Sequence, residues 1–198
     1  MNYNYQKIKT EISLVVEKAS KQNNHFGIGV WDYHILAVLK HSQTLGKKFK
    51  ADMEVLELAA ILHDYSGIKD YKFYPEHHVI SGEMAEKLLK KYNYPQEKIE
   101  HIKECIFSHR GSVKMKRRTI EAKILASADA MSHITETADM FHLAYNIHGY
   151  GIREGAIWLK GKLQRSWAKT MPTGKEMVRA DYKIAMKILN KALENKSK

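Results

Sequence analysis

The sequence predicts an all-α protein, a single helical bundle that carries a C-terminal helical extension. Apolar residues recur at the three- and four-residue spacing of amphipathic helices along most of the chain. No segment shows convincing period-two alternation, which would indicate a half-buried strand. The breaks between periodic segments contain Gly, Pro or Asn, residues that interrupt helices. Together these observations favour a fold built from helices alone.

Eight helices are expected, and several of them have recognisable ends. Asp52 suits an N-cap, Pro95 suits the first turn of a helix, and Gly46 suits a C-terminal stop. Between the third and fourth helices we expect an irregular stretch at 65–76, because it contains Gly67 and Pro75. The expected helices are 5–21, 32–46, 52–62, 79–92, 95–108, 119–140, 154–169 and 175–195.

Length and charge limit the possible organisation and partners. The 198 residues fit one domain spanning 1–198, with its core at about 26–140 and C-terminal helices at about 154–195. The net charge of +11 favours anionic partners. Much of the excess follows Ala156, where Lys183, Lys187 and Lys191 recur every four residues, as on a solvated helix face. No basic motif interleaved with aromatics is present, so nucleic acid is the less favoured partner.

The sequence also bears on cellular location. No window is long and apolar enough to span a bilayer, so we expect no membrane association. The N-terminal residues lack the hydrophobic centre of a signal peptide, which predicts a cytoplasmic protein. The single cysteine, Cys105, excludes an internal disulfide and a thiolate-rich zinc site.

The candidate chemistry begins with the His63-Asp64 pair, which follows an apolar run at 56–62. An imidazole beside a carboxylate can hold a hard or borderline divalent metal. His34 lies in the first turns of the second expected helix, and Asp129 lies in an apolar stretch of the sixth. A carboxylate there is costly to bury unless it is paired or binds a metal. We therefore expect a metal site whose ligands come from three helices.

Two further histidines could hold a second ion. His78 precedes the fourth expected helix and His109 follows the fifth, so both lie at helix ends. If they reach the far side of Asp64, that carboxylate could bridge two metals about 3.5–4 Å apart. Either His77 or His78 could be the ligand, whereas His133 is read as a non-ligand. Imidazole and carboxylate ligands without cysteine suit Mn, Fe, Co, Ni or Zn better than Mg.

The order of these residues resembles the HD-domain superfamily of metal-dependent phosphohydrolases, in which His, His-Asp and a distant Asp follow one another. His34, His63-Asp64 and Asp129 match that order. His78, with glycine four residues later, and His109 are similar to histidines of the binuclear branches. The segment 119–129 resembles small stand-alone HD hydrolases. The resemblance is strong over about 31–133.

The resemblance implies metal-dependent hydrolysis of a phosphate ester or phosphoanhydride, with a nucleotide as the favoured substrate. It assigns the first ion to His34, His63, Asp64 and Asp129, and a second, if present, to His78 and His109. We expect Asp64, Lys69 and Arg110 to be catalytic, the two cations by stabilising the negative charge that develops on the phosphate. Lys69, like Lys72, could equally be a solvated loop charge.

Other functional classes stay open at this point. The same pocket could belong to a non-catalytic module that senses a nucleotide. The positive charge motivates a nucleic-acid-binding protein or nuclease, whose polymer binding would depend strongly on salt. A plain helical scaffold would bind no metal. Exposed aromatics could support a homo-oligomer, although the sequence identifies no surface for it.

Overall fold

The computed structural model describes residues 3–23, 25–26, 29–111 and 115–194, and every regular element in these ranges is a helix. This confirms the all-α prediction. Most are α-helices; η1 and η3 are π-helical turns and η2 is a 3₁₀ helix. In chain order they are α1 (Tyr5–Gln22), η1 (Val30–Ile35), α2 (Leu36–Phe49), α3 (Met53–Leu62), α4 (Tyr65–Lys69), η2 (Tyr71–Glu76), α5 (His77–Lys90), α6 (Gln96–Ser108), α7 (Ile120–Thr135), α8 (Thr137–His142), η3 (Leu143–Ile147), α9 (Ile152–Lys169) and α10 (Pro172–Leu193).

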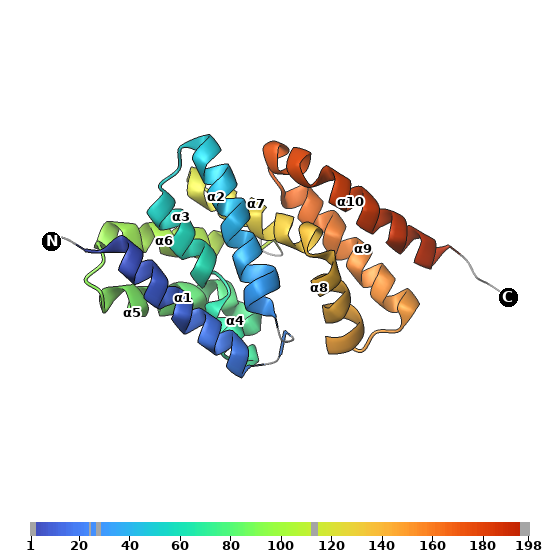
Figure 1. Cartoon of the computed structure of the whole chain (residues 1–198), viewed down its shortest axis with the longest axis horizontal. Helices are drawn as coiled ribbons and strands as arrows, with labels where there is room; N and C mark the ends of the chain where they lie inside the picture. The colour runs from blue at the N-terminus through green and yellow to red at the C-terminus, as the bar shows by residue number, and fades with distance from the viewer. Residues whose placement is uncertain (1–2, 24, 27–28, 112–114, 195–198) are drawn as a thin grey trace.

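The helices form two groups with α7 between them. Figure 1 shows α1 to α6 in one half of the molecule and α8 to α10 in the other. Helix α7 contacts α2, α3 and α6 in the first group and α9 and α10 in the second. One cluster of buried apolar side chains extends from Ile8 in α1 to Leu189 in α10. The C-terminal helices thus share a core with the rest of the chain.

The two most buried helices carry the residues of interest. In α3 every residue from Val55 to Leu62 is buried, and in α7 burial is continuous from Ile124 to Ser132. A helix that is apolar on all sides must lie inside the fold. His63 and Asp64 follow the end of α3, and Asp129 lies within α7. The core helices therefore carry these polar groups to the interior.

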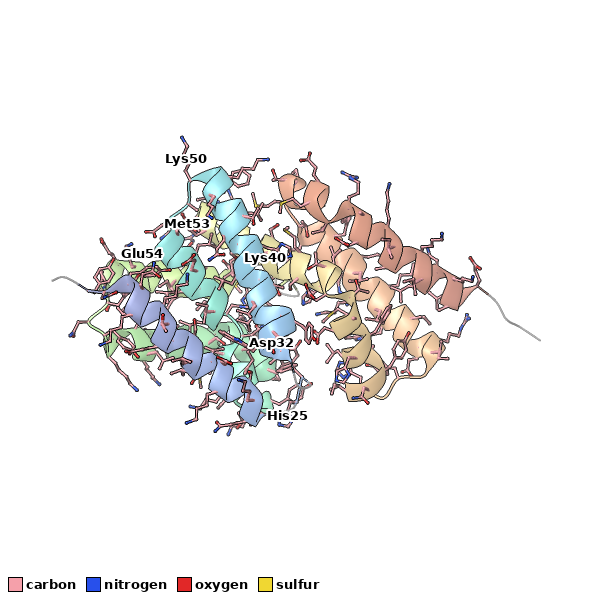
Figure 2. The ribbon with its side chains drawn as sticks, in the orientation of Figure 1. His25, Asp32, Lys40, Lys50, Met53 and Glu54 are labelled. Atoms are coloured by element: carbon pink, nitrogen blue, oxygen red, sulfur yellow. The ribbon has the colours of Figure 1, made fainter. Side chains whose placement is uncertain are left out.

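The turn from α2 into α3 tests two expectations, and Figure 2 labels Lys50, Met53 and Glu54 around it. Asp52 is the N-cap of α3, and its carboxylate accepts hydrogen bonds from the next helical amides. The expected stop at Gly46 is wrong, because α2 continues to Phe49 and Lys50 caps it at φ 54°. Gly46 serves packing instead: a Cβ there would lie 2.7 Å from Met53 Sδ.

Several other parts of the sequence prediction differ from the structure, and α5 and α9 each begin two residues earlier than expected. The stretch 65–76 is helical rather than irregular, since it forms α4 and η2. The expected helix 119–140 ends at Thr135, and Glu136 leaves helical geometry before α8 begins. The Thr137 hydroxyl donates to the Ile134 carbonyl at 2.6 Å, a side-chain bond that competes with the helix. Helix α10 begins at Pro172 rather than 175, with proline in its first turn.

Within the described ranges, no helix combines the length and the apolar character that crossing a membrane would require.

Candidate metal centre

Side chains from several helix ends meet inside the molecule. His34 belongs to η1, a π-helical turn that leads into α2, and such turns are frequent at functional sites. His63 caps the C-terminus of α3, His77 begins α5, and His109 caps α6. Asp129 reaches the same place from the middle of α7. Residues up to 95 positions apart in sequence thus share one site.

One half of the site surrounds Asp64 Oδ2. His34 Nε2 lies 3.4 Å from this oxygen and His63 Nε2 lies 3.5 Å from it. The two Nε2 atoms are 3.2 Å apart. Asp129 Oδ1 is 3.7 Å from His34 Nε2 and 4.0 Å from His63 Nε2. The structure therefore brings together the four side chains expected to hold a first ion.

The other half surrounds Asp64 Oδ1. His77 Nε2 lies 3.3 Å from it and His109 Nε2 lies 3.4 Å from it. This oxygen is buried and accepts no hydrogen bond from the described residues. Of the two alternatives, His77 and His78, this geometry favours His77 as the candidate ligand, because consecutive helical residues face different directions and His77 takes the inward one. His78 Nδ1 lies 3.4 Å from the Arg110 guanidinium instead.

The outer nitrogens of three histidines are held by backbone carbonyls. A carbonyl can only accept, so each of these Nδ1 atoms carries the proton and each Nε2 presents a lone pair to the site. Such contacts orient histidine ligands in metal sites. The Nδ1 to oxygen distances are 2.8 Å from His63 to Ala60, 2.7 Å from His77 to Tyr74 and 2.5 Å from His109 to Ile106.

His34 has the same tautomer for a different reason. Its Nδ1 lies 3.0 Å from the Ser132 hydroxyl, which itself donates to the Asp129 carbonyl at 2.8 Å. Because the serine proton is used there, the hydroxyl accepts from His34 Nδ1–H. His34 and His63 therefore turn unprotonated nitrogens toward each other, and so do His77 and His109, whose Nε2 atoms are 3.3 Å apart. Facing lone pairs beside carboxylates suit a cation between them.

Electrostatics keeps three of these groups in the forms that bind metals, and His34 is the exception. Burial lowers the pKa of His34, but the carboxylates of Asp64 and Asp129 outweigh burial and raise it above its ordinary value. Burial lowers the pKa of His63 to about 4, so its imidazole is neutral near pH 7. Burial alone would raise the pKa of Asp64, but the neighbouring His63 and His77 hold it well below its ordinary value. Burial opposes ionisation of Asp129 too, but Lys169 and the nearby histidines His133, His34 and His109 together hold that pKa well below its ordinary value. Neutral imidazoles and ionised carboxylates are what divalent ions require.

Two residues of the site were not expected from the sequence. His133 Nε2 lies 3.7 Å from Asp129 Oδ1, one helical turn away on α7, although it was read as a non-ligand. Its spacing of four residues from Asp129 could have indicated this. Lys169, at the end of α9, forms an ion pair with Asp129 Oδ2. No local pattern links Lys169 to residues 40 positions away.

Three overlapping groups of side chains could hold metal ions, and within each group the ligand atoms lie within 4.8 Å of one another. The groups are His34, His63 and Asp64; His34, Asp129 and His133; and Asp64, His77 and His109. Asp64 belongs to two of them through opposite oxygens. The donor set and the buried, unbonded Asp64 Oδ1 fit a divalent cation, and the two oxygens of Asp64 face different pairs of histidines.

A cavity of about 340 Å³ opens beside the cluster. Its walls include cationic side chains from two directions: Arg110 after α6, and three residues of α9. Lys69 does not line it; this side chain is exposed at the end of α4, whose inward residues are Tyr65 to Ile68. The full set of wall residues is Asp64, Tyr74, His77, His109, Arg110, Gly111, Asp129, His133, Trp158, Lys162, Arg165, Ser166 and Lys169.

Comparison with known proteins agrees with this architecture. An uncharacterized protein from Clostridium beijerinckii is 30% identical over 103 residues, which are 51% of this chain and 63% of that relative, so the match spans less than two thirds of its length. The crystal structure of a predicted HD superfamily hydrolase from an uncultured Thermotogales bacterium has a similar fold. Its TM-score is 0.63 at 19% identity, covering 93% of this chain and 90% of the other.

The decisive match is to a family. Residues 31–134, a little over half of the chain, match the HD domain family. That range contains His34, the His63-Asp64 pair and Asp129, the residues whose order the sequence singled out. The protein therefore belongs to the HD domain family.

Proposed function

We propose that the protein is a metal-dependent phosphohydrolase that cleaves a phosphate ester or phosphoanhydride, with a nucleotide as its substrate. The observation that carries this proposal is the two-sided Asp64 carboxylate. Oδ2 faces His34 and His63, whereas Oδ1 faces His77 and His109. This pattern suits two divalent ions bridged by one carboxylate, with the first also held by Asp129. Paired ions favour phosphoryl displacement.

The chain's own residues have distinct tasks in this proposal. His34, His63, His77, His109, Asp64 and Asp129 would hold the ions. When bound, such ions supply Lewis acidity, which makes water more acidic and offsets charge on phosphoryl oxygens.

Arg110 lines the cavity beside His109, and its guanidinium donates to the Pro75 carbonyl, which fixes its position. From there it can offset charge that develops on a phosphate in the cavity.

An aromatic ring in the cavity supports a nucleotide as the substrate. Trp158 lines the same cavity as the candidate metal ligands, and so does Tyr74, whose ring already stacks on Tyr71 and His77. Base stacking on aromatic rings is sequence-tolerant and contributes about 1–3 kcal/mol per base in nucleic-acid complexes. A cavity lined by cationic residues, candidate metal ligands and the Trp158 ring offers surfaces for both a phosphate and a base.

The test compares wild type with Asp64→Asn, which keeps the size of the side chain but removes its charge. Activity on a general phosphate ester and on a nucleotide panel is measured with Mn²⁺, Co²⁺, Ni²⁺ and Mg²⁺. We expect hydrolysis by wild type and background rates for the variant. Asp181→Asn, on the exposed side of α10, is the matched control and should retain activity.

Equal rates for wild type and Asp64→Asn would contradict the proposal. A metal-loaded wild type that binds a nucleotide without forming product would favour a sensing module. Salt-dependent binding to long nucleic acids, together with no binding to mononucleotides, would favour a nucleic-acid-binding role.

A further inference from the structure

One face of α9 adds a row of cations to the cavity. Lys162, Arg165 and Lys169 all line it, and their spacing of three and four residues places them on the same side of the helix. Helix α9 begins at Ile152, after the segment 31–134 that matches the family. This row therefore comes from the part of the chain outside the matched segment.

The charge of the cavity exceeds what one phosphate group would balance. Four cationic residues line it, Arg110 and the three of α9, beside the carboxylates of Asp64 and Asp129. Divalent ions held by those carboxylates would offset both of them. A single phosphate ester carries only about 1.5 to 2 negative charges at neutral pH. A ligand with several linked phosphates balances this site better.

The individual contacts leave two of these cations available. Lys169 pairs with Asp129, and its Nζ lies 3.4 Å from the His109 carbonyl, so it contacts the candidate metal ligands directly. Lys162 and Arg165 form no ion pair with any residue in the described ranges. Lys162 and Lys169 are seven residues apart, or about 10 Å along the helix axis. The row therefore runs along one wall of the cavity, and Lys162 at its other end also lines a smaller cavity with His34 and Asp64.

We propose that this face of α9 is an oligophosphate subsite: Lys162 and Arg165 bind phosphates linked to the one that lies at the metal ligands. The inference deepens the proposed function and rests on it for the position of the reacting phosphate. It assigns the substrate to compounds with at least two linked phosphates, and it makes Lys162 and Arg165 specificity-determining residues.

The first experiment measures anion binding without catalysis. Inorganic tripolyphosphate and orthophosphate are titrated by calorimetry into metal-free protein in EDTA at 150 mM salt. We expect at least about tenfold tighter binding of tripolyphosphate to wild type, because each additional phosphate can form charge-assisted contacts. Lys162→Gln with Arg165→Gln should remove most of that preference.

The matched control is Lys160→Gln with Lys183→Gln, which removes the same net charge from positions outside the cavity. It should keep the tripolyphosphate preference of wild type. Equal binding of both anions by wild type, or an equal loss in the control, would overturn the subsite. Lys162→Arg keeps the charge and should retain the tripolyphosphate binding of wild type. Thermal unfolding checks that each variant is folded.

The second experiment separates this inference from the proposed function. In metal-loaded protein, the Lys162 and Arg165 double variant should raise KM for a nucleoside triphosphate about tenfold or more, and by a clearly larger factor than it raises KM for a monoester. A protein that prefers tripolyphosphate but hydrolyses no phosphate would refute the proposed function and keep the subsite. A protein that hydrolyses monoesters without that preference would keep the function and refute the subsite.

Discussion

At the scale of single residues, the site depends on which nitrogen of each histidine carries the proton. Backbone carbonyls fix the Nδ1 protons of His63, His77 and His109, and the Ser132 hydroxyl fixes that of His34. Each Nε2 lone pair is thereby directed at Asp64 before any ion binds. This preorganisation reduces the cost of ordering ligands. The backbone thus contributes to the site as directly as the ligating side chains do.

Neighbouring histidines provide a matched test of this geometry. We expect His77→Gln to weaken the binding of the second ion by at least about tenfold, because its Nε2 is lost from the Oδ1 side of Asp64. His78→Gln should leave metal binding unchanged, since His78 lies beside Arg110. Metal content by mass spectrometry and titration with Mn²⁺ measure both. The reverse order of effects would contradict the placement of His77.

The Lys169–Asp129 pair predicts a stability change that depends on metal. Lys169→Met leaves the Asp129 carboxylate buried without its closest cation. We expect the free energy of unfolding of the metal-free protein to fall by about 2–3 kcal/mol, since breaking a buried pair is costly. Saturating Mn²⁺ should recover much of this loss by binding the carboxylate.

Urea denaturation with and without Mn²⁺ measures the effect of Lys169→Met, and Lys160→Met is the control on the same helix. An equal loss in both conditions would mean that Asp129 does not hold the ion.

At the scale of elements, helix contacts decide where the ligands lie. Helix α3 is close to α2 because Gly46 has no side chain, and a Cβ there would meet Leu56 Cδ2 and Met53 Sδ at 2.7 Å. The start of α2 continues from the turn that carries His34, and the end of α3 carries His63. The separation between these helices therefore affects the distance between two ligands.

Gly46→Ala should destabilise the protein by about 1–3 kcal/mol, because the added methyl overfills this contact. Gly82→Ala in α5 is the control: the nearest atoms to its added Cβ would lie 3.9 Å away, in ordinary contact. We expect that variant to be neutral or slightly more stable, since alanine is the better helix former. Chemical denaturation compares the two, and similar losses would contradict the packing role of Gly46.

The contact between α2 and α7 predicts a pH dependence. Burial lowers the pKa of His41 to about 4, and its Nε2 lies 3.1 Å from the Thr135 hydroxyl. The unfolded chain takes up a proton near the ordinary value of about 6.5, so stability is full above that pH and falls as pH decreases toward 4.

His41→Gln should remove about 2–3 kcal/mol of this acid destabilisation, given about 1.4 kcal/mol per pKa unit. Urea denaturation between pH 4 and 7 measures the slope. An unchanged slope in the variant would assign the acid sensitivity to other groups.

At the scale of the whole molecule, one site connects elements from both halves. Candidate ligands come from η1, α5, α7 and the C-terminal ends of α3 and α6, while α9 closes the cavity from the other group of helices. Because the unfolded chain cannot assemble these groups, metal binding should stabilise the folded state as a whole. Figure 1 shows how α7 joins the two groups.

Metal removal should therefore lower the Tm of the protein. At a free Mn²⁺ concentration of one hundred times Kd, linkage predicts a gain of about 2.7 kcal/mol in the free energy of unfolding. Thermal scans in EDTA and in increasing Mn²⁺ measure this gain. Asp64→Asn is the control, and its Tm should not respond to Mn²⁺. Equal Tm values for wild type in both conditions would favour a plain helical scaffold.

The sequence alone determined the helical class and most helix positions, and it singled out the candidate ligands His34, His63, Asp64, His109 and Asp129. The helices follow from local information such as apolar periodicity and capping residues, and Asp129 from the strong constraint on a carboxylate within an apolar helix, whereas the histidines follow from their resemblance to the family's order. The order of the ligands identified the family, which the match over 31–134 confirmed.

Only the tertiary structure decided the rest. His77 and His78 are adjacent in sequence, and only the rotation of α5 against α6 determines which one reaches Asp64. Lys169 meets Asp129 because α9 packs on α7, a contact for which the chain has no local pattern. Periodicity specifies which face of a helix is buried, but the packing of two distant helices determines which of their polar groups meet.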